Sequence, residues 1–335
     1  MGQPDISIIV LTYNHEEYIG ECLQSIIDQT FDGWEAIVVD DGSLDSTWAI
    51  VREFAARDKR IRAVRQENQG IGQLANTINK ALALTEGKLI AAIGGDDYWP
   101  KEKLEIQVGL HREHPNLILS YGRVLLTREG AIIGEYCFPP IIGMRSSADY
   151  LRLALLLKSC ILPIGVVIKA SSLREIGGYH QEFGFPGEDY PTYLRLLQLG
   201  GQAICIEDVV GYYRQSEGQI TRSHGYALSE GALKIAINQF ESLPNELREY
   251  IGISKPDIVK SHVKNSRMPN CLNEARKALI LKDKESAIWY GRELVRYGDV
   301  KRKLQGLYTV VAAHFGWTME PILEAYDKYI LQQSA

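Results

Sequence analysis

The 335-residue chain is poor in cysteine, and its cysteines are not spaced as pairs. There are five, an odd number, and none belongs to a CxxC motif: Cys22, Cys137, Cys160, Cys205 and Cys271. Such scattered cysteines argue against a disulfide framework and against a zinc site built on thiolates. We therefore expect a protein of the reducing cytoplasm.

The chain also lacks a basic surplus. Lysine and arginine number 37 against 42 aspartates and glutamates, which leaves a formal net charge of −5 at pH 7. Proteins that track a phosphate backbone usually carry an excess of positive charge. Nucleic acid is therefore not an expected partner, and any contact with a phosphate group must be local.

A long uninterrupted hydrophobic run is missing as well. The most apolar stretch, 151–168, is broken by Arg152, Lys158, Pro163 and Gly165, whereas a membrane-spanning helix needs about 20 apolar residues. The chain does not open with a basic segment followed by an apolar one. We expect neither a spanning helix nor an export signal.

Glycine is absent from the turn after the first predicted strand, which reads Leu11-Thr-Tyr-Asn-His-Glu-Glu-Tyr. Dinucleotide fingerprints and P-loops need glycine where the backbone meets phosphate, so neither motif is present there. A lone Gly70-Ile-Gly72 lacks the third glycine of such a fingerprint and is better read as the start of a helix.

What the sequence does contain is two acidic pairs, Asp40-Asp41 and Asp96-Asp97, each directly after a short apolar run. Such runs read as buried strands, and ligands of open α/β sheets bind beyond the carboxyl ends of the strands. Four carboxylates at one edge repel each other unless they meet donors or a hard cation, and Mg²⁺ or Mn²⁺ can bridge a diphosphate to protein. The pattern suggests a metal and a nucleotide together.

Apolar and amphipathic segments alternate through the first half of the chain. The predicted strands cover 6–12, 34–39, 61–65 and 88–93, and the predicted helices cover 16–29, 46–57, 72–84 and 101–114. This alternation predicts βαβ units in a mainly parallel sheet. Beyond it we expect a hairpin over 117–137, a helix over 149–157, a strand over 161–168, and a glycine-rich loop that leads to Glu188-Asp189.

From about residue 226 the pattern is helical, which predicts a domain over 1–225 and a helical one over 226–335. Candidate helices cover 227–241, 256–265, 271–281, 284–297, 299–314 and 319–332. Residues 276–304 hold nine Lys or Arg against four Asp or Glu, with Trp289, Tyr290 and Tyr297 among them. This segment is either a solvated helix face or a docking face for an anionic membrane or a lipid-phosphate acceptor.

Five motifs together resemble those of the family 2 glycosyltransferases: Ser7-Ile-Ile-Val-Leu-Thr-Tyr-Asn-His-Glu-Glu-Tyr-Ile, Val38-Val-Asp-Asp-Gly-Ser-Leu-Asp-Ser-Thr, Asn68-Gln-Gly, Gly95-Asp-Asp-Tyr-Trp and Gly187-Glu-Asp-Tyr. The resemblance covers roughly residues 5–215. It implies a GT-A fold, a Rossmann-like mixed α/β sheet flanked by helices, here with an all-α C-terminal appendix. It further implies an inverting, metal-dependent enzyme that uses a nucleotide sugar.

The resemblance places Thr12 and Asn14 under the base, Glu16 and Asn68 near it, and Asp41 on the imide hydrogen of uracil. A carboxylate at a strand end can indeed accept from an N–H donor. A structural alternative is that Asp40 or Asp41 caps the following turn. Asn68 has its own alternative, a loop asparagine that satisfies its own backbone.

By the same resemblance Asp96 is the direct ligand of Mn²⁺ or Mg²⁺, with Asp97 adjacent. The family motif often reads Asp-x-Asp-Asp, whereas this chain has Gly94 at the first position, so a contact from that side chain is missing. The alternative for one of the two aspartates is to cap the helix after Pro100.

The resemblance makes Asp189 the general base, and a helix-start cap is the alternative for Glu188-Asp189. The helix N-terminus should lower the pKa of the Asp189 carboxyl, while burial on acceptor binding would raise it. Arg214 matches a basic residue near the diphosphate, although an ion pair with Glu217 is an alternative. Family members often carry His two residues later, where this chain has Ser216. His224 is a weak candidate for that role.

We therefore expect an inverting hexosyltransferase that moves hexose or N-acetylhexosamine from a UDP-sugar to a glycan, lipid-linked or protein acceptor, in surface polysaccharide biosynthesis. The expected setting is the cytoplasm or the inner face of the membrane, and oligomerisation is open. The alternative is a catalytically silent nucleotide-sugar-binding or scaffold protein acting through its helical domain, for which Gly94 is the support. A sugar nucleotidyltransferase is disfavoured because its glycine-rich, arginine-bearing N-terminal motif is absent.

Overall fold

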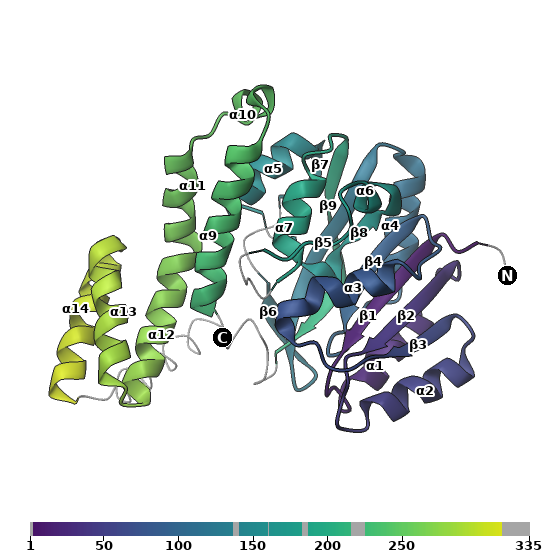
Figure 1. The fold of residues 1–335 in the computed structure, drawn as a ribbon, viewed down its shortest axis with the longest axis horizontal. Coiled ribbons are helices and arrows are strands. Elements are labelled where there is room, and N and C mark those ends of the chain that lie inside the picture. The colour runs from purple at the N-terminus through teal and green to yellow at the C-terminus, as the bar shows by residue number, and fades with distance from the viewer. Residues whose placement is uncertain (1–2, 137–140, 160, 183–186, 216–224, 317–335) are drawn as a thin grey trace. The chain divides into compact units, whose positions relative to one another are not determined.

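The structure is a computed structural model that describes residues 3–136, 141–159, 161–182, 187–215 and 225–316 (Figure 1). The chain divides into two compact units. One comprises Met1–Ser223 with Lys234–Ile253, and the other His224–Leu233 with Ser254–Ala335. The predicted boundary at 225/226 stays a prediction, and the structure adds that residues 234–253 belong with the first unit.

The first half alternates strands and helices, as the periodicity predicts. Its strands are β1 (Ile6–Thr12), β2 (Trp34–Asp40), β3 (Ile61–Arg65) and β4 (Leu89–Gly94). The helices between and after them are α1 (Ile19–Ile27), α2 (Thr47–Arg57), the 3₁₀ turn η1 (Ile71–Gln73) with α3 (Leu74–Leu82), and α4 (Lys103–Glu113).

The remainder of the first unit extends the same sheet. The predicted hairpin is present as β5 (Leu117–Arg128) and β6 (Ala131–Glu135), and the predicted helix as α5 (Ser147–Leu155). Of the expected strand over 161–168, residues 163–165 form a 3₁₀ turn, η2 (Pro163–Gly165), and only the last two residues belong to a strand, the short β8 (Val167–Lys169). The other elements are β7 (Gly143–Ser146), α6 (Ala170–Glu175), α7 (Asp189–Leu196) and β9 (Gln202–Arg214).

The described strands form one mixed sheet in the order β3-β2-β1-β4-β8-β5-β9-β7, with β6 paired to β5. β1, β2, β3 and β4 run parallel, with Thr12 opposite Asp40 and Leu11 opposite Gly94. The carboxyl ends of β1, β2 and β4 therefore reach the same edge. This register brings the two acidic pairs to one side of the molecule, where ligands of such sheets bind.

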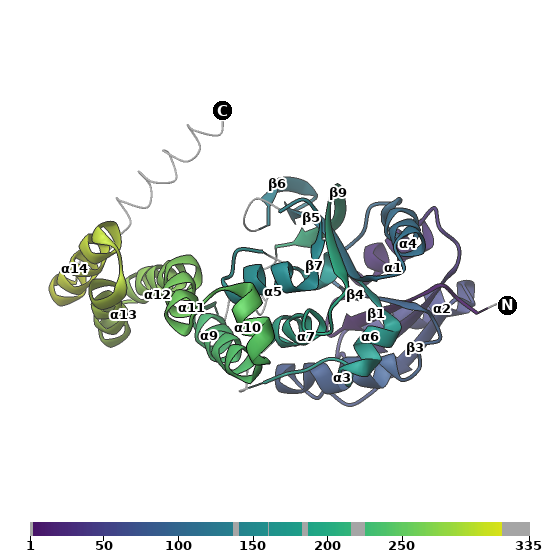
Figure 2. The same cartoon turned by 90° about the horizontal axis from the view of Figure 1, so that it is seen from above.

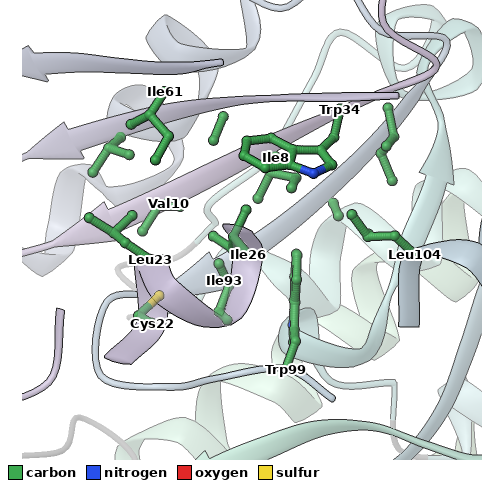
Figure 3. Packing of buried hydrophobic residues seen from close by; sticks show 14 of the residues in the cluster. Ile8, Val10, Cys22, Leu23, Ile26, Trp34, Ile61, Ile93, Trp99 and Leu104 are labelled. Atoms are coloured by element: carbon green, nitrogen blue, oxygen red, sulfur yellow. The ribbon is translucent and has the colours of Figure 1, made fainter. Parts of the chain in front are cut away.

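Alternation along the buried strands gives the sheet two apolar faces. Ile8 and Val10 of β1 pack with Leu23 and Ile26 of α1 and Leu104 of α4 in one large core cluster (Figure 3). Figure 2 shows α1 and α4 on one face of the sheet and α3 and α6 on the other. Helices on both faces explain why these strands read as continuous apolar runs.

The rest of the described chain is helical. It contains α9 (Gly225–Ser242), α10 (Asn245–Ile251), α11 (Lys255–His262), a π turn (Val263–Arg267), α12 (Met268–Ile280), α13 (Lys284–Tyr297) and α14 (Val300–Phe315). α10 was not predicted, and the helix predicted over 319–332 lies outside the described residues. Among the described residues no helix is both long enough and apolar enough to cross a membrane.

Candidate active site

Asp40 is fully buried at the end of β2, and its carboxylate is bound by neighbouring residues of the protein. One oxygen accepts from the backbone N–H of Ser43 at 3.3 Å and from the Ser43 hydroxyl. The other pairs with Nε of Arg65 at 3.0 Å. Asp40 therefore caps the turn after β2, and both of its carboxylate oxygens are engaged by Ser43 and Arg65.

Asp41, the next residue, is partly exposed and turns toward the loop after β3. Its Oδ1 accepts from Nε2 of Gln66 at 2.6 Å, and the backbone N–H of Gln69 donates to the carboxylate at 3.2 Å. Gly42 makes this approach possible, because a Cβ there would lie 2.7 Å from the backbone nitrogen of Asn68. Asp41 and Asn68 are thus held in one place by two loops.

The loop after β1 is fastened to the loop after β2 by the predicted base-binding residues. Asn14 has a left-handed backbone with φ of 53°, and its Oδ1 accepts from the backbone N–H of Leu44 at 2.8 Å. Oε2 of Glu16 accepts from the backbone N–H of Ser46 at 2.9 Å. The side chains of Asn14 and Glu16 therefore hold the loop after β1 against the loop after β2.

Thr12 ends β1 and is buried, yet its hydroxyl has no hydrogen-bond partner among the described residues. Gly95 lies directly beside it, since a Cβ at position 95 would meet Thr12 Oγ1 at 2.6 Å. A buried hydroxyl without a partner is costly. The position under the base that the sequence suggests for Thr12 would give it a polar neighbour.

Asp96 and Asp97 follow β4, and the structure gives them different surroundings. The carboxylate of Asp96 is partly exposed and accepts no hydrogen bond from the described part of the chain. Asp97 is 5% exposed, and its Oδ1 accepts from the backbone N–H of Arg214 at 2.9 Å. Burial and the neighbouring Asp96 hold the pKa of Asp97 well above its usual range, although Arg214 opposes the shift.

The end of β9 clamps the turn that carries this pair. Tyr98 and Tyr212 exchange two backbone hydrogen bonds, of 3.3 and 2.9 Å, and their rings stack with centroids 4.7 Å apart. Nε of Arg214 donates to the backbone oxygen of Asp96 at 2.8 Å. The turn after β4 is therefore fixed by a strand more than a hundred residues further along the chain.

The guanidinium of Arg214 is largely enclosed by aromatic and acidic neighbours. It lies over the rings of Tyr18 and Tyr98, at 4.8 and 5.1 Å from their centroids, and pairs with Oε2 of Glu21 at 2.5 Å. Its side chain is 12% exposed. Arg214 thus stands beside Asp96, while the alternative partner Glu217 lies outside the described residues. Ser216 and His224 do too.

Asp189 is the first residue of α7, after Glu188 at the N-cap position. Burial raises the pKa of Asp189, and the backbone N–H groups at the helix start only partly offset the shift. The lowered pKa expected from the helix start is therefore wrong, because desolvation outweighs the N–H groups. Burial and the Asp189 charge raise the pKa of Glu188 to about 8.

Tyr136 connects the neighbourhood of Asp189 to the end of β9. Burial raises the pKa of the Tyr136 hydroxyl, and the charge of Asp189 adds to the shift. The ring of Tyr136 meets that of Tyr213 edge to face, with centroids 5.4 Å apart. This contact places the Tyr136 ring against the end of β9.

Known proteins resemble the chain over the part that builds this site. The family model described as glycosyl transferase family 2 matches residues 7–132. The Escherichia coli enzyme named UDP-Glc:alpha-D-GlcNAc-diphosphoundecaprenol beta-1,3-glucosyltransferase WfgD is 30% identical over 220 residues, which cover 64% of this chain and 79% of that protein. The chain belongs to glycosyl transferase family 2.

Another E. coli family 2 relative, WfaP, has the same enzyme description as WfgD and is 28% identical over 219 residues, covering 64% of this chain and 79% of that protein. Among solved structures, S. aureus TarS 1-349 in complex with UDP-GlcNAc matches with a TM-score of 0.64 at 20% identity, over 93% of this chain and 92% of that one. The likeness confirms the GT-A fold. Because 93% of the chain is covered, it extends into the helical C-terminal region.

The residues of this family 2 member fit a divalent cation in one respect. Asp96 offers an oxygen ligand of the kind that Mg²⁺ and Mn²⁺ take, and it has no other described partner. Among the described residues no group of three or more His, Cys, Asp or Glu gathers to hold a metal ion. A cation would therefore take its remaining oxygens from diphosphate and water, as Mg²⁺ often does in proteins.

Several residues of the site escaped sequence reasoning. Glu21 and Tyr18 stand at Arg214, Gln66 holds Asp41, and Tyr136 lies near Asp189. Gln66 could have been suspected because it directly follows a predicted strand. Glu21 could not, since it lies on the predicted first helix 193 residues from its partner.

Proposed function

We propose that this glycosyltransferase is an inverting, metal-dependent enzyme that transfers a sugar from a UDP-sugar to a glycan or lipid-linked acceptor in surface polysaccharide assembly. One observation carries the proposal. The Asp96 carboxylate has no described hydrogen-bond partner, although it stands beside a fixed arginine at the edge of the sheet. A carboxylate without a partner among the described residues, next to an arginine at the ligand edge of an α/β sheet, suits a metal-bridged diphosphate.

The base of the nucleotide is assigned to the loops after β1, β2 and β3. Asp41 is the residue that accepts from the imide N–H of uracil, with its orientation supported by Gln66 and Gln69. Thr12, Asn14 and Glu16 form the first loop, and Asn68 closes the site from the third. The similar TarS structure holds UDP-GlcNAc, which supports a UDP-sugar by analogy of fold.

The diphosphate is assigned to Asp96, Asp97 and Arg214. A bound cation would supply positive charge at the leaving phosphates, with Asp96 as its ligand. Asp97 acts beneath it by fixing the backbone of Arg214, which limits its own share in metal binding. The Arg214 guanidinium adds a second positive charge that stabilises the departing UDP.

Asp189 is the proposed general base. Its carboxylate takes the proton from the acceptor hydroxyl while that oxygen attacks the anomeric carbon from the face opposite the diphosphate. The bond from the anomeric carbon to the diphosphate oxygen breaks, UDP leaves with the electron pair, and the configuration inverts. A raised pKa suits this role because it makes the carboxylate a stronger base.

The acceptor is proposed from the relatives. WfaP and WfgD are named for transfer to GlcNAc on diphosphoundecaprenol. A lipid-linked glycan at the cytoplasmic side of a membrane is therefore the acceptor class that we favour.

Release of UDP from a panel of UDP-sugars, with and without Mn²⁺ or Mg²⁺, tests the proposal. We expect slow hydrolysis of one donor in the presence of metal and inversion at the anomeric carbon, read by NMR. Thermal stabilisation by UDP plus metal measures binding separately. Absence of both UDP binding and UDP release under every metal condition would refute the enzyme and favour the alternative of a silent scaffold, for which Gly94 is the motivation.

A further inference from the structure

Helix α14 carries a continuous apolar stripe on its exposed side. The stripe consists of Val300, Leu304, Leu307, Val311 and Phe315, which are between 42% and 77% exposed. They follow one another at steps of four, three, four and four residues, the spacing of a single helix face. A row of five exposed large apolar side chains on one helix face marks an interaction surface.

The opposite face of α14 is already used within the helical unit. Its buried residues are Gly306, Thr309, Ala312 and Ala313, and the two alanines pack with Ala278, Leu279 and Ala287 of the neighbouring helices. Gly306 permits a close approach to α13, since a Cβ there would lie 2.5 Å from the backbone oxygen of Gly291. The helix is thus anchored by small residues, with its large apolar ones turned outward.

Within α14 the charged side chains are all basic, and the acidic neighbour of the helix is Asp299, its exposed N-cap residue. α14 contains Lys301, Arg302 and Lys303 and no aspartate or glutamate. Lys301 and Lys303 are exposed and fall on opposite sides of the stripe in helical projection, whereas Arg302 is partly buried and donates to Gln305 at 3.1 Å. An apolar face bordered by lysines is typical of a helix that lies in the plane of an anionic membrane surface.

We propose that the α14 stripe docks the protein on an anionic phospholipid surface. The apolar side chains enter the boundary between headgroups and acyl chains, and the two lysines pair with lipid phosphates. Pairing of the stripe with that of a second copy is less favourable, because both partners would present lysines and no acid on this helix. The sequence left 276–304 open between a solvated helix face and a docking face, and the proposed docking surface lies on α14, residues 300–315. This inference does not rest on the proposed reaction.

Vesicle flotation of the full chain tests the proposal. Vesicles of equal parts phosphatidylcholine and phosphatidylglycerol are compared with pure phosphatidylcholine, at low and high salt. We expect binding to the anionic vesicles that weakens with salt, since each lysine near the surface contributes about fivefold in affinity. Leu304→Gln with Leu307→Gln should lower the partition coefficient about tenfold or more. Lys301→Gln with Lys303→Gln should abolish the preference for anionic lipid.

Matched controls lie elsewhere on the surface. Ile132 and Ile133 of β6 are 60% and 48% exposed, so Ile132→Gln with Ile133→Gln repeats the chemical change away from the stripe. Lys59→Gln with Lys88→Gln does the same for the charges, because both lysines are exposed. Both controls should bind as wild type. An unchanged melting temperature confirms that the stripe variants remain folded.

Three results would overturn the proposal. The first is no flotation of the wild-type chain with anionic vesicles, and the second is a stripe variant that floats as well as its control. The third is a wild-type dimer in sedimentation that becomes monomeric in the stripe variant without any vesicle binding. That outcome would assign the stripe to self-association.

Discussion

The carboxylate of Asp96 occupies the space that a side chain at Gly94 would need. A Cβ on residue 94 would lie 2.7 Å from Oδ1 of Asp96, a separation that real Cβ atoms do not show. The carboxylate therefore lies over a position that other family 2 motifs often fill with an aspartate side chain. The glycine here is coupled to the orientation of the remaining metal residue.

Gly94→Ala should displace the Asp96 carboxylate. We expect the Mn²⁺ concentration for half-maximal activity to rise about tenfold, because one ligand must rotate away from its present orientation. The measurement is a metal titration of UDP release, with Gly109→Ala as the control, since a Cβ at Gly109 meets nothing within 4 Å. An unchanged titration would show that the present orientation of Asp96 is not the metal-binding one.

Arg214→Gln should lower kcat/KM by about 10²-fold, the scale of losing one charge-assisted contact to a developing anion. The reason is its place beside Asp96, over two tyrosine rings. Arg123→Gln provides the control, because Arg123 pairs with Glu135 on the surface. If Arg214→Gln only lowers the melting temperature and keeps kcat/KM, the arginine is a clamp for the turn and not a diphosphate ligand.

Asp189→Asn should lower kcat by about 10³-fold or more and leave the affinity for UDP unchanged. The wild-type rate should rise with pH along a limb above the ordinary aspartate range, because burial raises the pKa of Asp189 and the base must be ionised. The readouts are the pH dependence of kcat and the binding of UDP by calorimetry. Equal loss of affinity and rate in the variant would contradict the assignment.

Lys103 is fully buried at the start of α4, with its ammonium 4.6 Å from the centroid of Trp99 and hydrogen-bonded to Gln107. Burial lowers the pKa of Lys103 to about 7, below its value in the unfolded chain. Between these two values the unfolded state holds more protons, so the free energy of unfolding rises with pH. Below about pH 7 Lys103 is protonated in both the folded and the unfolded state, and the burial of its charge then lowers the free energy of unfolding by its full amount.

Lys103→Met should therefore stabilise the protein most at about pH 6, by ~3 kcal/mol, and by ~2 kcal/mol less at about pH 9. Urea unfolding at the two pH values measures the difference. Lys59→Met is the control, since Lys59 is exposed and its substitution should show no such pH dependence. A gain that is independent of pH would mean that Lys103 stays protonated in the fold across this range, so that its pKa is not lowered by burial.

Much of the fold follows from local pattern. The parallel half of the sheet is predicted by the apolar runs of β1, β2 and β4 and by the amphipathic helices between them. The turn around Gly130 predicts the hairpin β5–β6. The strand over 161–168 was wrong for most of its length, because Pro163 opens a 3₁₀ turn that the apolar composition hides. α10 follows Pro244 and is too short for its period to stand out.

The acidic motifs were found by their spacing, but the separate surroundings of their members were not. Asp40 and Asp41 are neighbours in sequence, but in the fold Asp40 pairs with Arg65, whereas Asp41 accepts a hydrogen bond from Gln66. Similarly, Asp97 meets Arg214 across 117 residues. The hydrophobic period of the sequence cannot predict such pairs, because it depends only on residues that are close together along the chain.

The sequence by itself determined the alternating α/β pattern, the family motifs and the strand ends at which polar chemistry gathers. Those features are local, because hydrophobic period and motif spacing are fixed by residues close together in the chain. The tertiary structure alone decided which carboxylate is buried against a backbone N–H, which one has no described partner beside Arg214, and which face of α14 is exposed. Burial and long-range hydrogen bonds depend on packing between distant segments, and packing sets the electrostatics of each group.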